Sequence, residues 1–333
     1  MSSRRVSAFV LGAVSAALLL VPTGASSART EPEHNVAIFY YPWYSTPKQD
    51  GGWAHWYVAG PDGGAPILST RYYPARSLYS SSNPSVVLAQ MREIAATGIG
   101  TVVVSWWGEG SPEAERVPLV AEAARRYGLD VAIHIEPYGG RGPASAAADI
   151  AMLEQQGITD FYVYDADSDP PAAWAEALAT LDGVRVFAQT NFVGRAKAGG
   201  FDGLYTYSVG TAIGSTFSRT CGQAHRAGLL CAPSVGPGYD ARLATGDPLV
   251  RPRLDGATYD RMWRTAVGAH PDLVTITSYN EWQEGTQIEP AHVQVGHAAY
   301  DGAWGKRGRA ARRAYLDATA RWVARFEAES VAR

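Results

Sequence analysis

The chain has 333 residues, of which 46% are hydrophobic and 18% are charged, and its 29 basic and 32 acidic residues give a net charge of −3. This composition is typical of a folded globular domain and excludes a disordered chain. Because the charges are balanced and no basic run is present, the sequence gives no electrostatic reason to expect a nucleic-acid partner.

Residues 1–28 have the order of features found in an export signal. Arg4 and Arg5 precede an apolar stretch that runs to Val21, and small residues follow as far as Ala28. The apolar stretch is shorter than the ~20 residues that a membrane-spanning helix needs, so a membrane anchor is the less favoured alternative. We therefore expect cleavage after Ala28 and a secreted, extracellular protein that is not attached to a membrane.

The two cysteines, Cys221 and Cys231, leave two possibilities open. An exported protein permits a disulfide, but placement on a helix and the following strand sets the two backbones near the limit of disulfide reach. The alternative is a pair of small apolar side chains. The spacing of the cysteines does not match a zinc site.

Eight short runs rich in β-branched or aromatic residues, each bounded by turn residues, predict strands. They are residues 36–41, 101–106, 131–137, 161–165, 184–190, 203–208, 229–235 and 273–280. The segments between them have the apolar spacing of helices, as in residues 84–98, where Asn83 can cap, and residues 113–128. Glycines expected to terminate helices just before the next strand are Gly98, Gly128, Gly157 and Gly228.

Strands that alternate with helices form parallel sheets, and eight such units predict an α/β fold, a closed (β/α)8 TIM barrel in a single domain over residues 34–333. The last helix is predicted over residues 309–326. A doubly wound sheet is the alternative fold. It is less favoured because the first strand leads into an aromatic loop, and not into the glycine-rich turn that binds ligands in such sheets.

The predicted carboxyl ends of the strands carry many aromatic and carboxyl side chains, and catalysis in a barrel takes place at this end. Aromatic faces combined with hydroxyl and carboxyl groups suit a sugar, whereas a phosphate needs cationic side chains or amide nests that these ends mostly lack. The residues are Tyr40, Tyr41, Trp43, Tyr44, Trp106, Trp107, His134, Glu136, Tyr138, Tyr164, Asp165, Tyr205, Tyr207, Ser234, Tyr239, Asn280, Glu281, Trp282 and Glu284.

Glu281 and Glu284 are the candidate catalytic residues. Three positions apart in the first turn after a strand, their carboxyl groups can lie on the same side, within the ~5 Å typical of retaining glycosidases. The same spacing is common on solvated helices, so it is the position at a barrel strand end that favours catalysis. One of the two carboxyl groups needs a raised pKa to act as an acid, and a neighbouring like charge raises it.

Other chemistries have weaker support in the sequence. Ser234 lies in A-P-S-V-G, where Ala232 replaces the first glycine of a nucleophile elbow. His134 and Glu136 point the same way on one strand, but no further ligand cluster accompanies them. We therefore expect no metal and no cofactor.

Seven blocks in order resemble glycoside hydrolase family 99, the endo-α-mannosidase and endo-α-mannanase family. The blocks are IFYYPWYSTP, HWY, HIEPY, FYVYD, FDGLYTY, PSVGPGY and ITSYNEWQEGTQIE, and they extend from Ile38 to Glu289. The resemblance implies a (β/α)8 barrel that hydrolyses internal α-mannosidic bonds with retention and without a catalytic metal. The expected partner is an α-linked mannose-containing polysaccharide or glycan, bound by a monomer.

The resemblance also implies roles for single residues. Glu281 would act as a base on the sugar's own 2-hydroxyl, giving a 1,2-anhydro sugar intermediate, and Glu284 would act first as the acid and later as the base. Glu136 would bind the sugar next to the cleaved bond. The other residues expected to bind substrate are Tyr41, Trp43, Tyr44, His55, Trp56, Trp106, His134, Tyr164, Tyr205, Tyr207, Tyr239, Arg242, Asn280 and Trp282.

The chain departs from the family pattern at three places. Gln283 stands where the family segment N-E-W-H-E-G has histidine, and the segment after PSVGPGY is shorter, so that Arg242 either replaces a substrate-contacting arginine or has no such role. The region between HIEPY and FYVYD is also short, which would open the cleft and alter what lies beyond the bond being cut. These departures bear on substrate range more than on reaction type. Two alternatives stay open, a glycosidase that acts on another α-linkage and a carbohydrate-binding protein that has lost catalysis.

Overall fold

The structure is a computed structural model that describes residues 36–211 and 214–331. The predicted export signal, residues 1–28, lies outside the described residues. Within the described ranges, no helix has both the length and the apolar character needed to cross a membrane.

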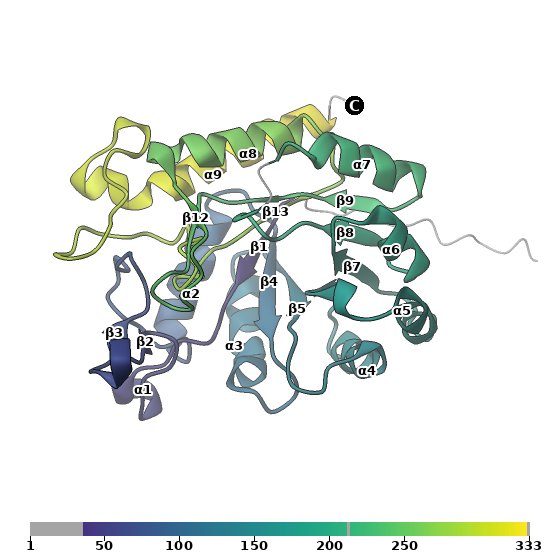
Figure 1. Ribbon diagram of the computed structural model, residues 1–333, viewed down its shortest axis with the longest axis horizontal. Helices are drawn as coiled ribbons and strands as arrows, with labels where there is room; N and C mark the ends of the chain where they lie inside the picture. The colour runs from purple at the N-terminus through teal and green to yellow at the C-terminus, as the bar shows by residue number, and fades with distance from the viewer. Residues whose placement is uncertain (1–35, 212–213, 332–333) are drawn as a thin grey trace, which may run out of the picture. The chain divides into compact units, whose positions relative to one another are not determined.

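Within these described ranges, a parallel sheet of nine strands is the core of the fold (Figure 1). Its strand order is β10-β13-β1-β4-β5-β6-β7-β8-β9, and each neighbouring pair is parallel. The strands are β1 (Val36–Tyr40), β4 (Thr101–Trp106), β5 (Asp130–Ile135), β6 (Asp160–Val163), β7 (Arg185–Gln189), β8 (Gly203–Tyr205), β9 (Leu230–Ala232), β10 (Ser234–Val235) and β13 (Val274–Ile276).

The sheet closes at Pro233, the single residue between β9 and β10. β9 pairs with β8 and β10 pairs with β13, while the carbonyl of Pro233 accepts a hydrogen bond from Thr275 N at 3.1 Å. Proline has no N–H group to donate to a neighbouring strand. At Pro233 the chain can therefore stop pairing with β8 and begin to pair with β13. The eight predicted strands therefore all exist, with residues 229–235 divided in two, and the (β/α)8 barrel is confirmed.

Helices follow the strands around the outside of the sheet, α3 to α7 in succession in Figure 1. The helices are α2 (Pro84–Ala95), α3 (Pro112–Arg125), α4 (Pro143–Glu154), α5 (Pro171–Leu178), α6 (Val193–Ala198), α7 (Phe217–Arg226), α8 (Ala257–Val267) and α9 (Ala314–Val331). Asn83 caps α2 as predicted, since its side chain accepts a hydrogen bond from Ser85 N at 3.0 Å. The predicted last helix differs at its start, where residues Gly308–Arg313 form a 3₁₀ helix.

The predicted helix terminators are confirmed by their backbone angles. Gly98, Gly128, Gly157 and Gly228 have φ values of 82°, 68°, 89° and 72°, all in the left-handed region. Glycine adopts this region without the steric penalty of a side chain, so each helix stops where the next strand begins.

Two connections at the carboxyl ends of the strands carry small hairpins. The connection from β1 to α2 holds a short helix α1 (Pro47–Asp50) and the strand pair β2 (Tyr57–Val58) and β3 (Ile67–Leu68). The connection after β10 holds the pair β11 (Tyr239–Asp240) and β12 (Val250–Arg251). Both hairpins belong to the end of the barrel where catalytic residues are found.

Cys221 on α7 and Cys231 on β9 form a disulfide, which decides between the two possibilities that the sequence left open. Their Cα atoms are 5.2 Å apart, well inside the usual range for a disulfide. The expectation of a separation near the limit was therefore wrong. The reason is that α7 packs directly on β9, the strand that follows it.

Candidate active site

Three carboxyl groups interact at the carboxyl end of the barrel, those of Glu136 after β5 and of Glu281 and Glu284 after β13. Burial, followed by the charges of Glu284 and Glu136, raises the pKa of Glu281 well above its usual value. Burial and the charges of Glu136 and Asp247 raise the pKa of Glu284 to about 7. The two carboxyl groups therefore titrate as an interacting pair, in which the charge of one favours the protonated form of the other.

Glu281 is buried, with 3% of its surface exposed, and its backbone is fixed by a hydrogen bond from its N–H to Ser278 Oγ at 2.8 Å. Its Oε1 atom is buried and has no hydrogen-bond partner among the residues that the structure describes. A buried carboxylate oxygen without a donor is costly. The site therefore favours a ligand that brings a hydroxyl group to this oxygen.

The hydroxyl of Tyr44 holds the chain on both sides of Glu281. It donates to Asn280 O at 3.0 Å and accepts from Trp282 N at 3.1 Å. Tyr44, Asn280 and Trp282 are fully buried, and so is Trp56, whose Nε1 donates to Tyr79 O at 2.8 Å. These four predicted site residues lie behind the segment that carries Glu281 and support it.

Glu136 is held by residues of two neighbouring strands. Ser105 Oγ on β4 donates to its Oε1 atom at 2.8 Å, and His134 Nδ1 lies 2.9 Å from the same oxygen, without the alignment of a hydrogen bond. The other ring nitrogen of His134 shares a hydrogen bond with Tyr205 Oη at 2.8 Å. His134 and Tyr205 are buried, so they fix Glu136 from inside the barrel.

Tyr41 and Tyr207 bring hydroxyl groups from β1 and β8 to the carboxyl cluster, where they form a hydrogen bond with each other. Burial, and then the charges of Tyr41 and Glu284, raises the pKa of Tyr207. Tyr207 has a left-handed φ of 46°, and Ser234 Oγ accepts from its N–H at 2.7 Å. The ring of Tyr164 lies 5.1 Å from that of Tyr207. These hydroxyl groups can serve as partners for a polar ligand.

An aromatic stack adjoins Tyr41. The ring of Trp43 lies 4.6 Å from Tyr41 and stacks on His55 at 4.4 Å with only 5° between the ring planes. Burial lowers the pKa of His55, while a hydrogen bond with the Gln283 side chain opposes this shift. Gln283, the residue that departs from the family pattern, therefore contacts the aromatic stack. Trp106, the last residue of β4, is buried, and its ring lies 5.8 Å from that of Tyr138.

The β11–β12 hairpin contacts the acid-bearing turn. Asp240 N donates to the backbone oxygen of Glu284 at 2.7 Å, and Tyr239 Oη donates to Asp247 at 2.8 Å. Arg242 is exposed and forms a two-point ion pair with Asp240, at 2.9 and 2.8 Å. Of the predicted site residues, Arg242 is therefore directed to its own hairpin and not to the carboxyl cluster.

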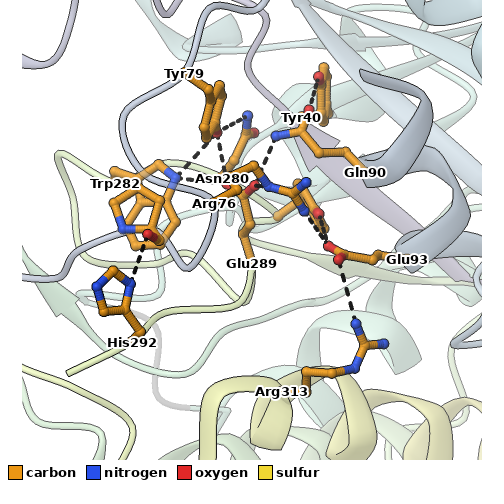
Figure 2. A network of polar contacts seen from close by, with 12 residues as sticks. Tyr40, Arg76, Tyr79, Gln90, Glu93, Asn280, Trp282, Glu289, His292 and Arg313 are labelled. Carbon is orange, nitrogen blue, oxygen red and sulfur yellow. Dashed lines mark hydrogen bonds and ion pairs between the residues drawn. The ribbon is translucent and has the colours of Figure 1, made fainter. Parts of the chain in front are cut away.

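Several residues of the site escaped the sequence analysis, namely Ser105, Asp247, Tyr79 and Glu289. Glu289 is fully buried, accepts a hydrogen bond from Trp282 Nε1 at 2.8 Å (Figure 2), and lies at the end of the last block, between Ile288 and Pro290. This apolar context was a signal of burial, but nothing local marks its partners. Within the described residues no group of three or more His, Cys, Asp or Glu side chains is arranged to hold a metal ion.

A closed parallel barrel with interacting carboxyl groups, aromatic faces and hydroxyl groups at its carboxyl end is the architecture of a glycoside hydrolase. The family profile described as glycosyl hydrolase family 99 matches residues 32–328. The chain belongs to this family and is a glycoside hydrolase. The resemblance found in the seven sequence blocks is thereby confirmed.

Relatives and solved structures agree with this assignment. A glycoprotein endo-α-1,2-mannosidase-like protein of Danio rerio is 33% identical, over 78% of this chain and 72% of that protein. A glycoprotein endo-α-1,2-mannosidase of Xenopus laevis is 31% identical, over 78% of this chain and 70% of that protein. The solved family 99 endo-α-mannosidase of Bacteroides thetaiotaomicron superimposes with a TM-score of 0.79 at 28% identity, covering 90% of this chain and 99% of that one.

Proposed function

We propose that this protein is a secreted, retaining, endo-acting enzyme that cleaves internal α-mannosidic bonds in an α-mannan or a glucosyl-mannose glycan. One observation carries the proposal, the buried and unpartnered Oε1 of Glu281 beside Glu284, whose pKa is raised to about 7. The names of the relatives support the mannosidic substrate. The basic, apolar and small-residue order of residues 1–28 supports export.

In the first step Glu281 accepts the proton of the sugar's 2-hydroxyl, and the 2-oxygen attacks the anomeric carbon. The glycosidic bond breaks as Glu284 gives its proton to the leaving oxygen, so a 1,2-anhydro sugar and a shortened glycan are formed. A carboxyl group with a pKa of about 7 is protonated often enough at neutral pH to serve as this acid. A hydroxyl donor at Glu281 Oε1 stabilises the ionised form of that residue.

In the second step Glu284, now ionised, accepts a proton from water, and the water oxygen attacks the anomeric carbon. The bond to the 2-oxygen breaks and this oxygen takes back the proton held by Glu281, which restores both carboxyl groups. Two displacements on opposite faces give net retention of configuration. An α-mannoside suits the route because its axial 2-hydroxyl lies on the face opposite the leaving group.

The remaining side chains of the site bind the sugar in this proposal. Glu136 accepts hydrogen bonds from hydroxyl groups of the sugar next to the cleaved bond. The hydroxyl groups of Tyr41, Tyr207 and Tyr164 form further hydrogen bonds with the sugar. Trp43 stacked on His55 offers an aromatic face to the C–H side of a ring. The buried residues Tyr44, Trp56, Trp106, His134, Tyr205, Asn280 and Trp282 support these groups.

The test is hydrolysis of an α-1,2-mannan and a glucosyl-α-1,3-mannoside by the mature protein, with the anomer released first identified by NMR. Glu281→Gln and Glu284→Gln are compared on the glycan and on an α-mannosyl fluoride. We expect first release of the α-anomer, and a loss of 10²- to 10⁴-fold in both variants on the glycan. Because fluoride leaves without an acid, Glu284→Gln is expected to keep more of its activity on the fluoride than Glu281→Gln.

First release of the β-anomer would contradict retention, and a wild-type enzyme that is folded but inactive on both mannosides would contradict the substrate class. A panel of other α-linked glucans and mannans is assayed in parallel. Turnover of an α-glucan alone would show that the catalytic site serves another linkage.

A further inference from the structure

Glu289 is a fully buried carboxylate that takes no part in the two proposed chemical steps. Four donors surround it (Figure 2). Arg76 Nε and Gln90 Nε2 donate to Oε1 at 2.7 and 2.9 Å, and Tyr79 Oη and Trp282 Nε1 donate to Oε2 at 2.7 and 2.8 Å. A buried carboxylate with four donors, one of them a guanidinium, is satisfied and therefore holds its donors in fixed positions.

Two of these contacts reach the residues next to Glu281. Trp282, which follows Glu281, donates its indole N–H to Glu289. The hydroxyl of Tyr79 lies 3.4 Å from Asn280 Nδ2 and 3.3 Å from Trp282 Nε1, accepting from both while it donates to Glu289. Asn280 and Trp282, the residues on either side of Glu281, thus both bond to the hydroxyl of Tyr79, and Trp282 also bonds to the carboxylate of Glu289.

The outer part of the same network is separate from Glu281. Arg76 also donates to Glu93 at 2.6 Å, and Glu93 accepts from Tyr279 Oη at 2.7 Å and pairs with Arg313 at 3.5 Å. Of these, Glu93 on α2 and Arg313 at the start of the C-terminal helical segment lie toward the surface, and Figure 2 shows Arg313 at the far end of the series. The network therefore has an inner end at Asn280 and Trp282, the neighbours of Glu281 in the chain, and an outer end at the side chains of Glu93 and Arg313, which contact none of the predicted catalytic or substrate-binding residues.

We propose that Glu289 is a positioning residue for Glu281 and that it acts through Tyr79 and Trp282. The proposal rests on the proposed function, because it assigns to Glu281 the role of base. Glu281 must place an oxygen at the sugar's 2-hydroxyl, and a displacement of about 1 Å at a catalytic group is enough to cost on the order of 10²-fold in rate. Sugar binding by the tyrosine hydroxyls and by Glu136 does not pass through Glu289, so the loss falls on kcat.

The chain offers a matched pair of variants for the test. Tyr79 and Tyr279 are both buried tyrosines whose hydroxyl donates to a carboxylate of this network at 2.7 Å, Tyr79 to Glu289 and Tyr279 to Glu93. Phe keeps the ring in each case and removes only the hydroxyl. For Tyr79→Phe we expect kcat to fall about 10- to 100-fold with KM within two-fold of wild type, and for Tyr279→Phe we expect kcat and KM within two-fold of wild type.

Equal losses of kcat in the two variants, or no loss in Tyr79→Phe, would overturn the proposal, because a purely structural role predicts the same response at both ends. Glu289→Gln is a second variant. An amide group turns an N–H toward at least one donor, so we expect a larger loss of kcat than in Tyr79→Phe together with a lower melting temperature.

A measurement that needs no turnover separates this proposal from the proposed function. Crystal structures of both phenylalanine variants are compared with that of the wild type, with the Glu281 carboxyl group as the readout. A shifted Glu281 in Tyr79→Phe and an unmoved one in Tyr279→Phe supports the positioning role even if the wild type fails on both mannosides. An unmoved Glu281 in Tyr79→Phe rejects the role, whatever the substrate is.

Discussion

The side-chain amide of Asn280 pairs with both backbone groups of Tyr41, accepting from its N–H at 2.8 Å and donating to its carbonyl at 2.9 Å across 239 positions of sequence. The end of β1 is thereby joined to the segment that carries Glu281. Asn280→Ala leaves two buried backbone groups without partners, so we expect the free energy of unfolding to fall by roughly 2 to 5 kcal/mol. Urea denaturation measures this loss.

The control for Asn280→Ala is Asn191→Ala, a change at an exposed asparagine, which we expect to alter the free energy of unfolding by less than about 0.5 kcal/mol. If both variants unfold at the same urea concentration as the wild type, the amide pair with Tyr41 does not contribute to stability.

The basic limb of the pH profile depends on the charge of Glu136. Glu284 must be protonated to act as the acid, so kcat/KM is expected to fall as the pH rises through about 7. The charge of Glu136 raises the pKa of Glu284 more than the charge of Asp247 does. Glu136→Gln should therefore move the basic limb to lower pH, and Asp247→Asn should move it less far. A limb that moves upward in either variant contradicts this assignment of the acid.

The raised pKa of Glu284 also makes stability depend on pH. The folded protein holds a proton on this group that the unfolded chain releases near pH 4.5. This contribution to stability is fully present below pH 4.5 and is lost as the pH rises to about 7. Glu284→Gln removes the titration, so its free energy of unfolding should fall less between pH 4.5 and 7 than that of the wild type. Parallel slopes from urea titrations across this range would exclude a raised pKa for Glu284.

Arg253 is expected to stabilise the turn that follows Glu284. Its guanidinium lies 4.6, 4.9 and 4.6 Å from the ring centres of Tyr72, Tyr300 and Tyr315, and its Nη2 donates to the carbonyls of Gly285 and Gln287 at 2.9 and 2.7 Å. Arg253→Met removes the charge and both donors, so we expect a loss of about 2 to 4 kcal/mol in unfolding free energy.

Arg126→Met is the matched control for Arg253→Met, because Arg126 pairs with Glu122 on an exposed helix face. Exposed pairs of this kind are screened by solvent and contribute little to stability. A loss in Arg253→Met no larger than that in Arg126→Met would show that the aromatic and carbonyl contacts of Arg253 add little.

The barrel was predictable because its signals are local. Each strand is a short β-branched or aromatic run, and a left-handed glycine follows four of the helices, so the pattern could be followed without knowing which strands pair. The division at Pro233 was not predicted, because residues 229–235 form one continuous apolar pattern. Only the pairing partners differ, since β9 pairs with β8 and β10 pairs with β13. The disulfide distance was misjudged because it depends on how closely α7 packs on β9.

The kinds of side chain at the candidate site could be predicted from the sequence, but their geometry could not. The sequence pattern makes Tyr41 and Tyr44 equal candidates for substrate binding. In the structure the hydroxyl of Tyr41 bonds to that of Tyr207, whereas the hydroxyl of Tyr44 bonds to the backbone of Asn280 and Trp282. Turns after strands have no fixed period, so the direction of each side chain follows from long-range packing. The contact of Tyr79 with Glu289 joins residues 210 positions apart, and no local pattern encodes it.

The closing contacts of the barrel have a consequence for synthesis of the chain. β1 is among the first described residues, yet one of its two neighbours is β13, whose partner residues begin at Val274. Until that segment leaves the ribosome, β1 and β10 each present an unpaired strand edge, the feature most prone to pair with other chains. Nascent chains of this protein are therefore expected to need chaperones until late in translation, and fragments that stop before β13 are expected to aggregate.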